Sequence, residues 1–191
     1  MTELSRDILR ERAVEHTESL VADVEDRWGA VRDEGSVVVS PLAHHDTAFP
    51  ESLREFHEEF YPYAAGCVTR DDAGRVLAVQ SVHRESWESP GGSGEPDEIP
   101  AETARREVRE ETGVVPGLAE PLYRVTMELD LGYDQTLPIP VFVFVGEPEA
   151  GDVLDADAVE TPGEVADVDW FDPTNLPENF RDRQLLRKHL G

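Results

Sequence analysis

Three glutamates, Glu107, Glu110 and Glu111, stand at positions i, i+3 and i+4 of a short stretch rich in helix-forming residues. On an α-helix, which advances about 100° per residue, these positions share one face, so the three carboxylates converge. Like charges this close repel one another, and a divalent cation would neutralise them. Hard carboxylate oxygens suit Mg²⁺ or Mn²⁺. The spacing therefore predicts a magnesium or manganese site on a helix.

The helix that carries these glutamates is predicted over residues 100–112. Pro100 suits the first helical position, and Gly113 suits the position just after the end. A neighbouring apolar stripe would dock the helix on a sheet and leave the glutamates at the sheet's edge. The stripe consists of Ala101, Ala104 and Val108.

A glycine-rich run, Pro90-Gly91-Gly92-Ser93-Gly94, precedes the helix and is predicted to turn the chain instead of continuing a strand. Glu98 follows in the loop. Arg106 lies one turn before Glu110, where its forked guanidinium could hold a carboxylate in place. The alternative is a solvent-exposed helix with Glu and Arg pairs, which an acidic protein often contains. The offsets of Gly92 and Glu98 disfavour this alternative, because an exposed helix face needs no such turn.

The whole segment from Gly92 to Val114 resembles the signature of the Nudix hydrolase family at every defining position. This resemblance implies hydrolysis of a pyrophosphate bond in a nucleoside diphosphate linked to another group, with Mg²⁺ or Mn²⁺ and an attacking water. The metal ligands that it implies are Glu107, Glu110, Glu111 and the Gly92 carbonyl. Glu98 and Arg106 are then supporting residues that orient the loop and a helix glutamate.

The resemblance leaves the general base open, since in this family it lies inside the motif or on a loop far downstream. Glu164 is our candidate, because it stands at the entrance of a predicted strand, 165–171, that resembles the Trp-containing late segment of many members. The other loop candidates are Glu160, Asp167 and Asp169. The predicted catalytic residues are Glu98, Arg106, Glu111 and Glu164. For Glu164, the alternative is an ordinary loop acid of an acidic protein.

The chain carries 42 acidic and 17 basic residues, a formal net charge of −25 over 191 residues. Such a charge repels polyanions and anionic membrane surfaces, which argues against nucleic acid or lipid partners and favours a small nucleotide as substrate. A basic protein partner or a cytoplasm at molar salt would explain the acidity. The even spread of the acids, and Lys188 as the single lysine, resemble proteins of extreme halophiles. Without a signal peptide pattern, we expect a cytoplasmic protein.

The predicted fold is an α/β/α sandwich with a mixed sheet. We expect residues 1–62 to form a helical extension, packed on the core or swapped between two copies in a homodimer, and residues 63–191 to form the Nudix hydrolase domain. Strands are predicted at 37–39, 64–69, 75–83, 122–131, 139–145 and 165–171, with 64–83 as a hairpin around a turn at 71–74. Further helices are predicted at 5–30, 52–60 and 181–190.

Two functional alternatives remain beside the hydrolase. One is a Nudix-like module that binds a nucleotide without turnover, which the intact glutamates disfavour. The other is an isomerase of the same fold. The substrate itself is left open among ADP-ribose, nucleoside triphosphates and dinucleoside polyphosphates, because loops outside the motif select it. His44-His45-Asp46 lacks a recognisable ligand pattern. Cys67 is expected to be a buried, inert thiol.

Overall fold

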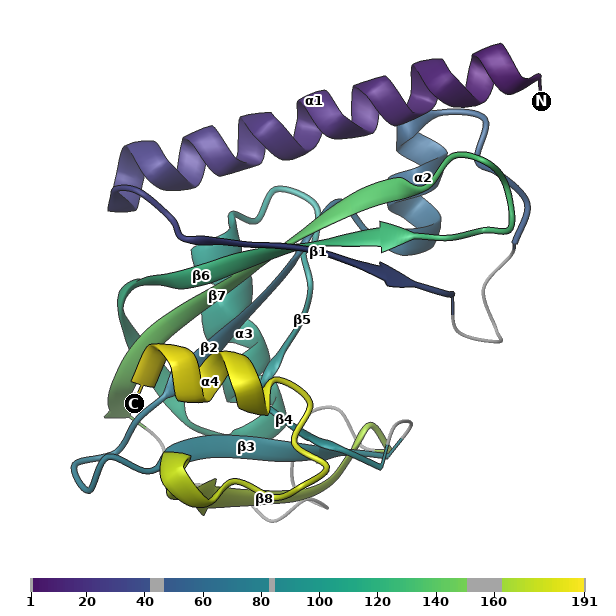
Figure 1. Cartoon of the computed structure of the whole chain (residues 1–191). Helices are drawn as coiled ribbons and strands as arrows, with labels where there is room; N and C mark the ends of the chain where they lie inside the picture. The colour runs from purple at the N-terminus through teal and green to yellow at the C-terminus, as the bar shows by residue number, and fades with distance from the viewer. Residues whose placement is uncertain (1, 42–46, 83–84, 151–162, 191) are drawn as a thin grey trace. The chain divides into compact units, whose positions relative to one another are not determined.

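The computed structural model of the protein describes residues 2–41, 47–82, 85–150 and 163–190. The chain forms two compact units. The first comprises Met1–Ala64, Ser93–Pro100 and Tyr123–Phe142. The second comprises Ala65–Gly92, Ala101–Leu122 and Val143–Gly191. Figure 1 labels the elements of both, and two long strands, β6 (Val115–Leu129) and β7 (Leu137–Ala150), contribute residues to each unit.

Two helices and strand β1 characterise the first unit. Helix α1 (Glu3–Trp28) begins at Thr2, whose hydroxyl accepts a hydrogen bond from the Ser5 amide, so the free amides of the first turn are capped. Helix α2 (Leu53–Phe60) is capped in the same way by Ser52. Strand β1 (Asp33–Val39) runs parallel to β6.

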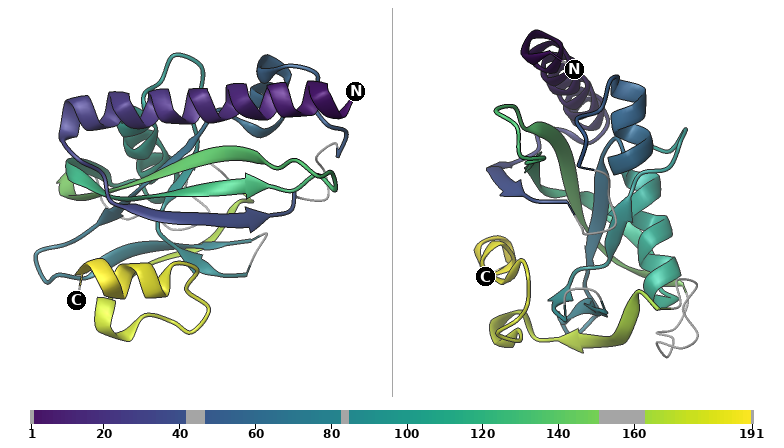
Figure 2. Two further views of the ribbon diagram at one scale, coloured as in Figure 1. Left: turned by 45° about the horizontal axis from the view of Figure 1, so that its top comes forward. Right: turned by 90° about the vertical axis from the view of Figure 1, so that its right-hand side faces the viewer.

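The core of the first unit is a cluster of buried apolar side chains between these helices and strands. Helix α1 contributes Leu9 and Ala13 at a spacing of one helical turn, and Figure 2 shows α1 lying along β6 and β7. The other members are Phe49, Phe56, Phe60, Leu129, Leu131, Leu137 and Ile139. The helix predicted at 5–30 is therefore confirmed as a helix, with the bounds Glu3–Trp28.

The second unit contains parts of two sheets. In one, β2 (Ala64–Thr69) lies between β7 and β5 (Gly91–Ser93). In the other, β3 (Val76–Ser81) lies between β4 (Trp87–Glu88) and β8 (Val165–Phe171), and both neighbours are antiparallel to it. Helix α3 (Pro100–Thr112), a 3₁₀ turn (Pro173–Asn175) and helix α4 (Arg183–Leu190) complete the unit. Parallel and antiparallel pairings together confirm the predicted mixed α/β fold.

The predicted hairpin at 64–83 is wrong. The turn forms, with the Asp71 amide bonded to the Arg75 carbonyl, but β2 and β3 join different sheets and share a single bridge, Arg70 with Val76. The reason is competition for partners: β2 bonds through the Cys67 amide to the Pro90 carbonyl, whereas β3 pairs along its whole length with β8.

The expectation that the glycine-rich run turns the chain is also wrong, because Gly91–Ser93 forms strand β5. Neither Gly91 nor Gly92 adopts a positive φ. Gly91 instead permits close backbone approach. A Cβ atom added to Gly91 would lie 2.7 Å from the Gly66 Cα atom, so neither Gly91 nor Gly66 tolerates a side chain at this crossing. Strands β1, β6 and β7 are also longer than predicted.

The remaining predictions concern two possible site segments, the single cysteine and membrane spans. His44-His45-Asp46 and Glu160 lie outside the described residues. Cys67 is buried, and burial raises the pKa of its thiol to about 12, as expected for an inert cysteine. None of the described helices has the length and apolar run needed to span a bilayer.

Candidate functional site

Helix α3 covers residues 100–112, as predicted from Pro100 at its first position and Gly113 just after its end. Ala104 and Val108 are fully buried on its inner face, and the Thr112 hydroxyl donates to the Val108 carbonyl at 2.5 Å. Gly113 adopts a φ of +80°, and its amide closes the helix on the Arg109 carbonyl at 2.8 Å. The buried face and the glycine cap fix both the rotation and the end of the helix, so the glutamates have a defined position within the second unit.

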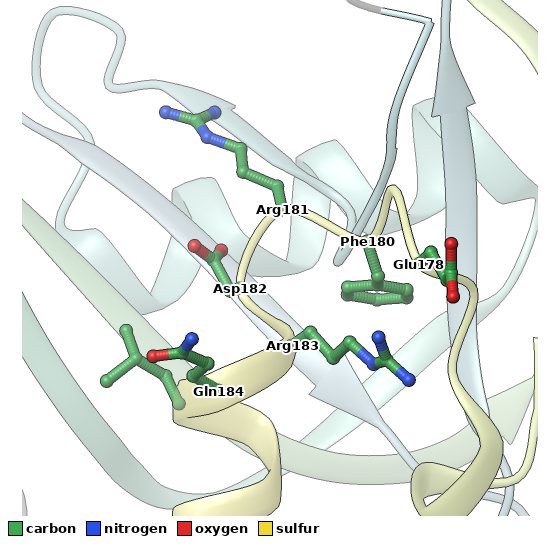
Figure 3. Close-up of a pocket in the computed structure, with 7 residues that line it drawn as sticks. Glu178, Phe180, Arg181, Asp182, Arg183 and Gln184 are labelled. Carbon is green, nitrogen blue, oxygen red and sulfur yellow. The ribbon is translucent and has the colours of Figure 1, made fainter.

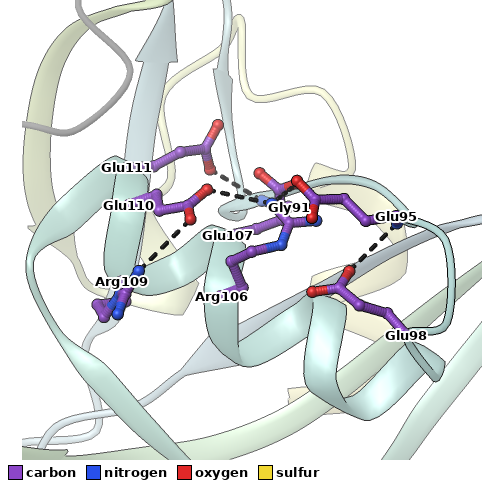
Figure 4. A network of polar contacts seen from close by, with 8 residues as sticks. All are labelled: Gly91, Glu95, Glu98, Arg106, Glu107, Arg109, Glu110 and Glu111. Carbon is purple, nitrogen blue, oxygen red and sulfur yellow. Dashed lines mark hydrogen bonds and ion pairs between the residues drawn. The ribbon is translucent and has the colours of Figure 1, made fainter.

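Arg106 holds two of the glutamates together. Its Nη1 atom lies 2.7 Å from Oε1 of Glu107 and 3.1 Å from Oε2 of Glu110 (Figure 4). These three side chains are between 12% and 20% exposed, so the ion pairs are shielded from solvent. Arg109 reaches the other oxygen of Glu110 at 3.4 Å. The predicted role of Arg106, that it holds a helix carboxylate, agrees with this geometry.

Glu111 faces the glycine strand. The Gly91 backbone amide donates to Oε2 of Glu111 at 2.9 Å, so strand β5 and helix α3 meet at this carboxylate (Figure 4). Gly92 lies against the next carboxylate of the cluster, because a Cβ atom added to it would stand 2.6 Å from the carboxylate atoms of Glu107. Gly92 is therefore a glycine because Glu107 fills the space that a side chain would need.

Burial disfavours the charged form of these acids. It raises the pKa of Glu111 to about 8, and the negative charges of Glu107, Glu88 and Glu164 act in the same direction against the Gly91 hydrogen bond. Burial also raises the pKa of Glu107, although Arg106 opposes this effect. Without a cation the cluster therefore favours protonated acids, and a bound cation would favour their charged forms.

The residues fit a divalent cation by their chemistry, since oxygen donors crowd one end of α3 and their charge is under-compensated. Within the described part of the chain, no three acidic, histidine or cysteine side chains already form a metal-binding group. Arg106 explains this, because its guanidinium takes oxygens of both Glu107 and Glu110.

Glu98 lies in the first unit, in the loop that follows β5. Its carboxylate accepts a hydrogen bond from the Glu95 amide at 3.2 Å, and its backbone carbonyl accepts one from the Tyr63 hydroxyl at 2.8 Å. Gly94 packs directly on the Tyr63 ring. These contacts give Glu98 the loop-ordering role that the sequence resemblance implies, and its catalytic role stays a prediction.

Glu164 is exposed at the entrance of β8, where its carbonyl accepts a hydrogen bond from the Val82 amide at 2.9 Å. Its charge is felt at both Glu107 and Glu111, which places it in electrostatic reach of the cluster. Asp167 and Asp169 are exposed on β8 and accept hydrogen bonds from their neighbouring amides. The negative charge of Glu164 contributes to the raised pKa of Glu107 and Glu111, and the choice of general base among these residues stays a prediction.

Sequence reasoning missed Glu88 and Arg181. Glu88, on β4, is 13% exposed and accepts a hydrogen bond at 3.0 Å from Arg181, which precedes α4. The only sequence signal was the position of Glu88, three residues before Gly91. A pocket of about 390 Å³ lies beside this segment, lined by Glu178, Phe180 and residues 181–185 (Figure 3). None of the predicted site residues lines it.

Comparison with known proteins adds three findings. A family model of the NUDIX domain matches residues 60–189. A MutT-like protein of Streptomyces ambofaciens is 33% identical over 125 residues, covering 64% of this chain and 71% of that protein, and an RNA pyrophosphohydrolase of Erythrobacter litoralis is 29% identical over 137 residues, covering 63% and 82%. The crystal structure of a MutT NUDIX hydrolase from Burkholderia pseudomallei matches with a TM-score of 0.55 at 20% identity, over 68% of this chain and 97% of that one, and shows a shared fold.

Proposed function

Because the chain belongs to the Nudix family, we propose that it hydrolyses a pyrophosphate bond in a nucleoside diphosphate linked to another group, in a reaction that depends on Mg²⁺ or Mn²⁺. The observation that carries this proposal is the arrangement of Glu107, Glu110 and Glu111 on α3, fixed by Arg106 and by the Gly91 amide. Carboxylate oxygens on one helix beside a glycine strand are the donors that a phosphate-bound divalent cation prefers.

The cation would be held by the carboxylates of Glu107, Glu110 and Glu111, with the Gly92 carbonyl as a further ligand. When bound, it supplies charge neutralisation on the phosphates and a lower pKa for the attacking water. Arg106 holds Glu107 and Glu110 side by side before the cation arrives, and its ion pairs would have to loosen for these carboxylate oxygens to bind a metal.

We assign the removal of the water proton to the carboxylate of Glu164. Its exposure lets water reach it, and its electrostatic reach to Glu107 and Glu111 supports a position near the cluster. Glu111 is the second candidate for this step, because the Gly91 amide occupies Oε2 and leaves Oε1 to accept a proton. Glu98 accepts a hydrogen bond from the Glu95 amide in the loop after β5, and we keep it as a predicted supporting residue.

The substrate is proposed to be a small nucleotide, such as ADP-ribose, a nucleoside triphosphate or a dinucleoside polyphosphate. The net charge of −25 supports this choice over a long polyanion. The similarity to an RNA pyrophosphohydrolase makes the 5′ end of RNA the competing substrate. Cytoplasmic location, a homodimer and a halophilic source remain our predictions from the sequence.

A substrate panel tests the proposal. Purified protein in molar KCl with Mg²⁺ or Mn²⁺ would be given ADP-ribose, nucleoside triphosphates, dinucleoside polyphosphates and a 5′-triphosphorylated oligoribonucleotide, and the products would be resolved by ion-exchange chromatography. We expect metal-dependent cleavage of a small nucleotide. Saturable nucleotide binding without any product would instead identify a silent binding module.

The general base is tested by comparing Glu164→Gln with Asp167→Asn and Asp169→Asn. We expect a loss of kcat of roughly 10²-fold or more for Glu164→Gln, as is usual for a general base. The two aspartate variants should keep nearly full turnover. Equal losses in all three variants would remove Glu164 from this role.

A further inference from the structure

The C-terminal segment is attached to the strand that leads into the site. Phe180 forms a parallel bridge with Trp87, and the Arg181 amide donates to the Trp87 carbonyl at 2.8 Å. One residue before these, the Asn179 side chain donates to the Glu85 carbonyl at 2.9 Å. Residues 179–181 thus run alongside the short segment that contains β4. The buried Phe180 ring anchors these three residues.

Arg181 adds a side-chain contact to this backbone pairing. Its Nη1 atom lies 3.0 Å from Oε2 of Glu88, whose side chain is 13% exposed, while that of Arg181 is 43% exposed. Figure 3 labels Arg181 among the residues that line the pocket, with its side chain extending away from Phe180 and Arg183. Arg181 therefore contacts Glu88 on β4 and also belongs to the pocket lining.

Glu88 is tied to the glutamate cluster through a short, stiff path. Pro90 lies between Glu88 and Gly91, and the Gly91 amide bonds to Oε2 of Glu111. The Pro90 carbonyl is itself held by the Cys67 amide at 3.1 Å. Glu88 therefore lies three residues before the amide that bonds to Glu111. The charge of Glu88 is also felt at Glu111.

A nearly buried carboxylate next to other buried acids is costly unless a cation accompanies it. Acids outnumber bases in this chain by 42 to 17, so few arginines are available to pair with an acid such as Glu88. One of these arginines, Arg181, contacts β4. The glutamate cluster explains this position better than surface solubility does, because the excess of acids already makes the surface soluble.

We propose that Arg181 and Glu88 form a positioning pair, which holds the β4–β5 segment and thereby sets the orientation of Glu111 for binding a divalent cation. This inference rests on the proposed metal-dependent hydrolase. Neither residue is assigned contact with substrate or metal. The pair acts through the Gly91 amide, in the way that outer hydrogen-bond partners orient the ligands of metal sites.

The test compares Arg181→Gln with Arg187→Gln, an exposed arginine on α4 whose loss changes the net charge equally. Binding of Mn²⁺ alone would be measured by electron paramagnetic resonance, without nucleotide. We expect the Mn²⁺ dissociation constant to rise about tenfold in Arg181→Gln and to stay within about twofold in Arg187→Gln. Arg181→Lys should recover part of the loss, because it keeps the charge but not the forked geometry.

A double variant separates positioning from simple unfolding. Glu88→Gln/Arg181→Gln removes the carboxylate on β4 together with its arginine, so its Mn²⁺ affinity should lie closer to the wild type than that of Arg181→Gln alone. Nucleotide KM at saturating metal should stay near the wild-type value in all variants. Thermal melting identifies any variant that does not fold, and Arg181→Lys then carries the comparison.

Equal Mn²⁺ affinity in Arg181→Gln and Arg187→Gln would overturn the inference, even if the enzyme hydrolyses nucleotides as proposed. Absence of Mn²⁺ binding in the wild-type protein would overturn it as well. A wild-type protein that binds Mn²⁺ with the expected dependence on Arg181 but cleaves no member of the substrate panel would uphold the pair and refute the proposed activity.

Discussion

Each unit buries a group of titratable side chains, and the two groups are handled in opposite ways. In the first unit, the rings of His16 and His57 lie 4.5 Å apart, and burial together with His16 lowers the pKa of His57 to about 4. In the second unit, burial raises the pKa of Glu111 to about 8. Burial favours the neutral form of both kinds of group, so the imidazoles stay neutral at neutral pH, whereas a carboxyl group of the cluster must bind a proton or a cation to be stabilised.

This difference separates residues that stabilise the fold from residues that carry chemistry. The histidine pair lies on two helices that pack into the apolar cluster of the first unit, which includes Phe56 and Phe60. The glutamate pair at Glu107 and Glu110 needs Arg106 to be tolerated at all. A site that costs stability in the absence of its ligand is typical of function.

Replacement of Glu111 by Gln should produce the largest effect and the clearest contrast between the units. We expect turnover to fall by at least about a hundredfold, because a metal ligand is lost. The melting temperature of the metal-free protein should stay equal or rise, because a buried charge is removed. Steady-state kinetics and circular dichroism would measure both, with the exposed Glu120→Gln as control. Wild-type turnover in Glu111→Gln would contradict the contrast.

Replacement of Phe56 by Ala should have the reverse pattern. Phe56 is 1% exposed in the apolar cluster of the first unit, so its truncation should lower the free energy of unfolding by about 3–5 kcal/mol. Turnover per folded molecule should change little. Urea unfolding and active-site titration would test this, with Phe56→Leu as the milder variant. A loss of kcat as large as that of Glu111→Gln would contradict the separation between residues that stabilise the fold and residues that carry chemistry.

The pH dependence of stability should slope in opposite directions for the two groups in the metal-free protein. Since the folded-state pKa of His57 is depressed, its contribution is present above pH 6.5 and is lost as the pH falls towards 4. With allowance for its half-buried position, the loss is about 1–2 kcal/mol. Since the folded-state pKa of Glu111 is raised, its contribution is present below pH 4.5 and is lost as the pH rises through 8.

Chemical unfolding of wild type, His57→Gln and Glu111→Gln with a chelator from pH 4 to 9 would resolve these slopes. His57→Gln should flatten the acidic limb, and Glu111→Gln should flatten the rise in stability towards lower pH on the neutral limb. Identical pH profiles in all three proteins would refute the assignment of both slopes.

Salt should have the smallest effect on the contrast. With a net charge of −25, the whole chain should gain a few degrees of melting temperature as KCl rises from 0.1 to 1 M, where the Debye length falls to about 3 Å. Glu120→Gln and Glu111→Gln should show nearly the same gain, because repulsion is spread over the surface. A lower melting temperature at high salt would contradict the halophilic interpretation.

The sequence predicted the elements whose limits are set locally. Helix α3 runs from Pro100 to Thr112 and β8 from Val165 to Phe171, both at the predicted boundaries, because proline, glycine and apolar spacing act within a few residues. The contact of Arg106 with Glu110 follows from helical spacing, since the two lie four residues apart, whereas its contact with the adjacent Glu107 does not. Local spacing of this kind is sufficient to assign the part of the candidate site that lies on α3.

The strand limits and side-chain contacts that the sequence did not predict depend on contacts between residues far apart in the chain. Strand β6 begins at Val115 and continues through Pro116 and Gly117, which sequence rules treat as interruptions. A Cβ atom added to Gly146 would lie 2.5 Å from the Gly117 carbonyl, so these glycines serve the pairing of two strands. Arg181, which contacts Glu88, lies 93 residues away along the chain, and no periodic pattern in the sequence predicts a contact at that separation.

The crossing of Gly66 and Gly91 restricts how this enzyme can be engineered. Exchange of glycine for alanine is a standard route to thermostability, because it lowers the entropy of the unfolded chain. At Gly66 a methyl group would meet the Pro90 carbonyl at 2.6 Å and push away the segment whose amide orients Glu111. Libraries selected for heat resistance with retained turnover should therefore be depleted of substitutions at Gly66, although this residue carries no functional group.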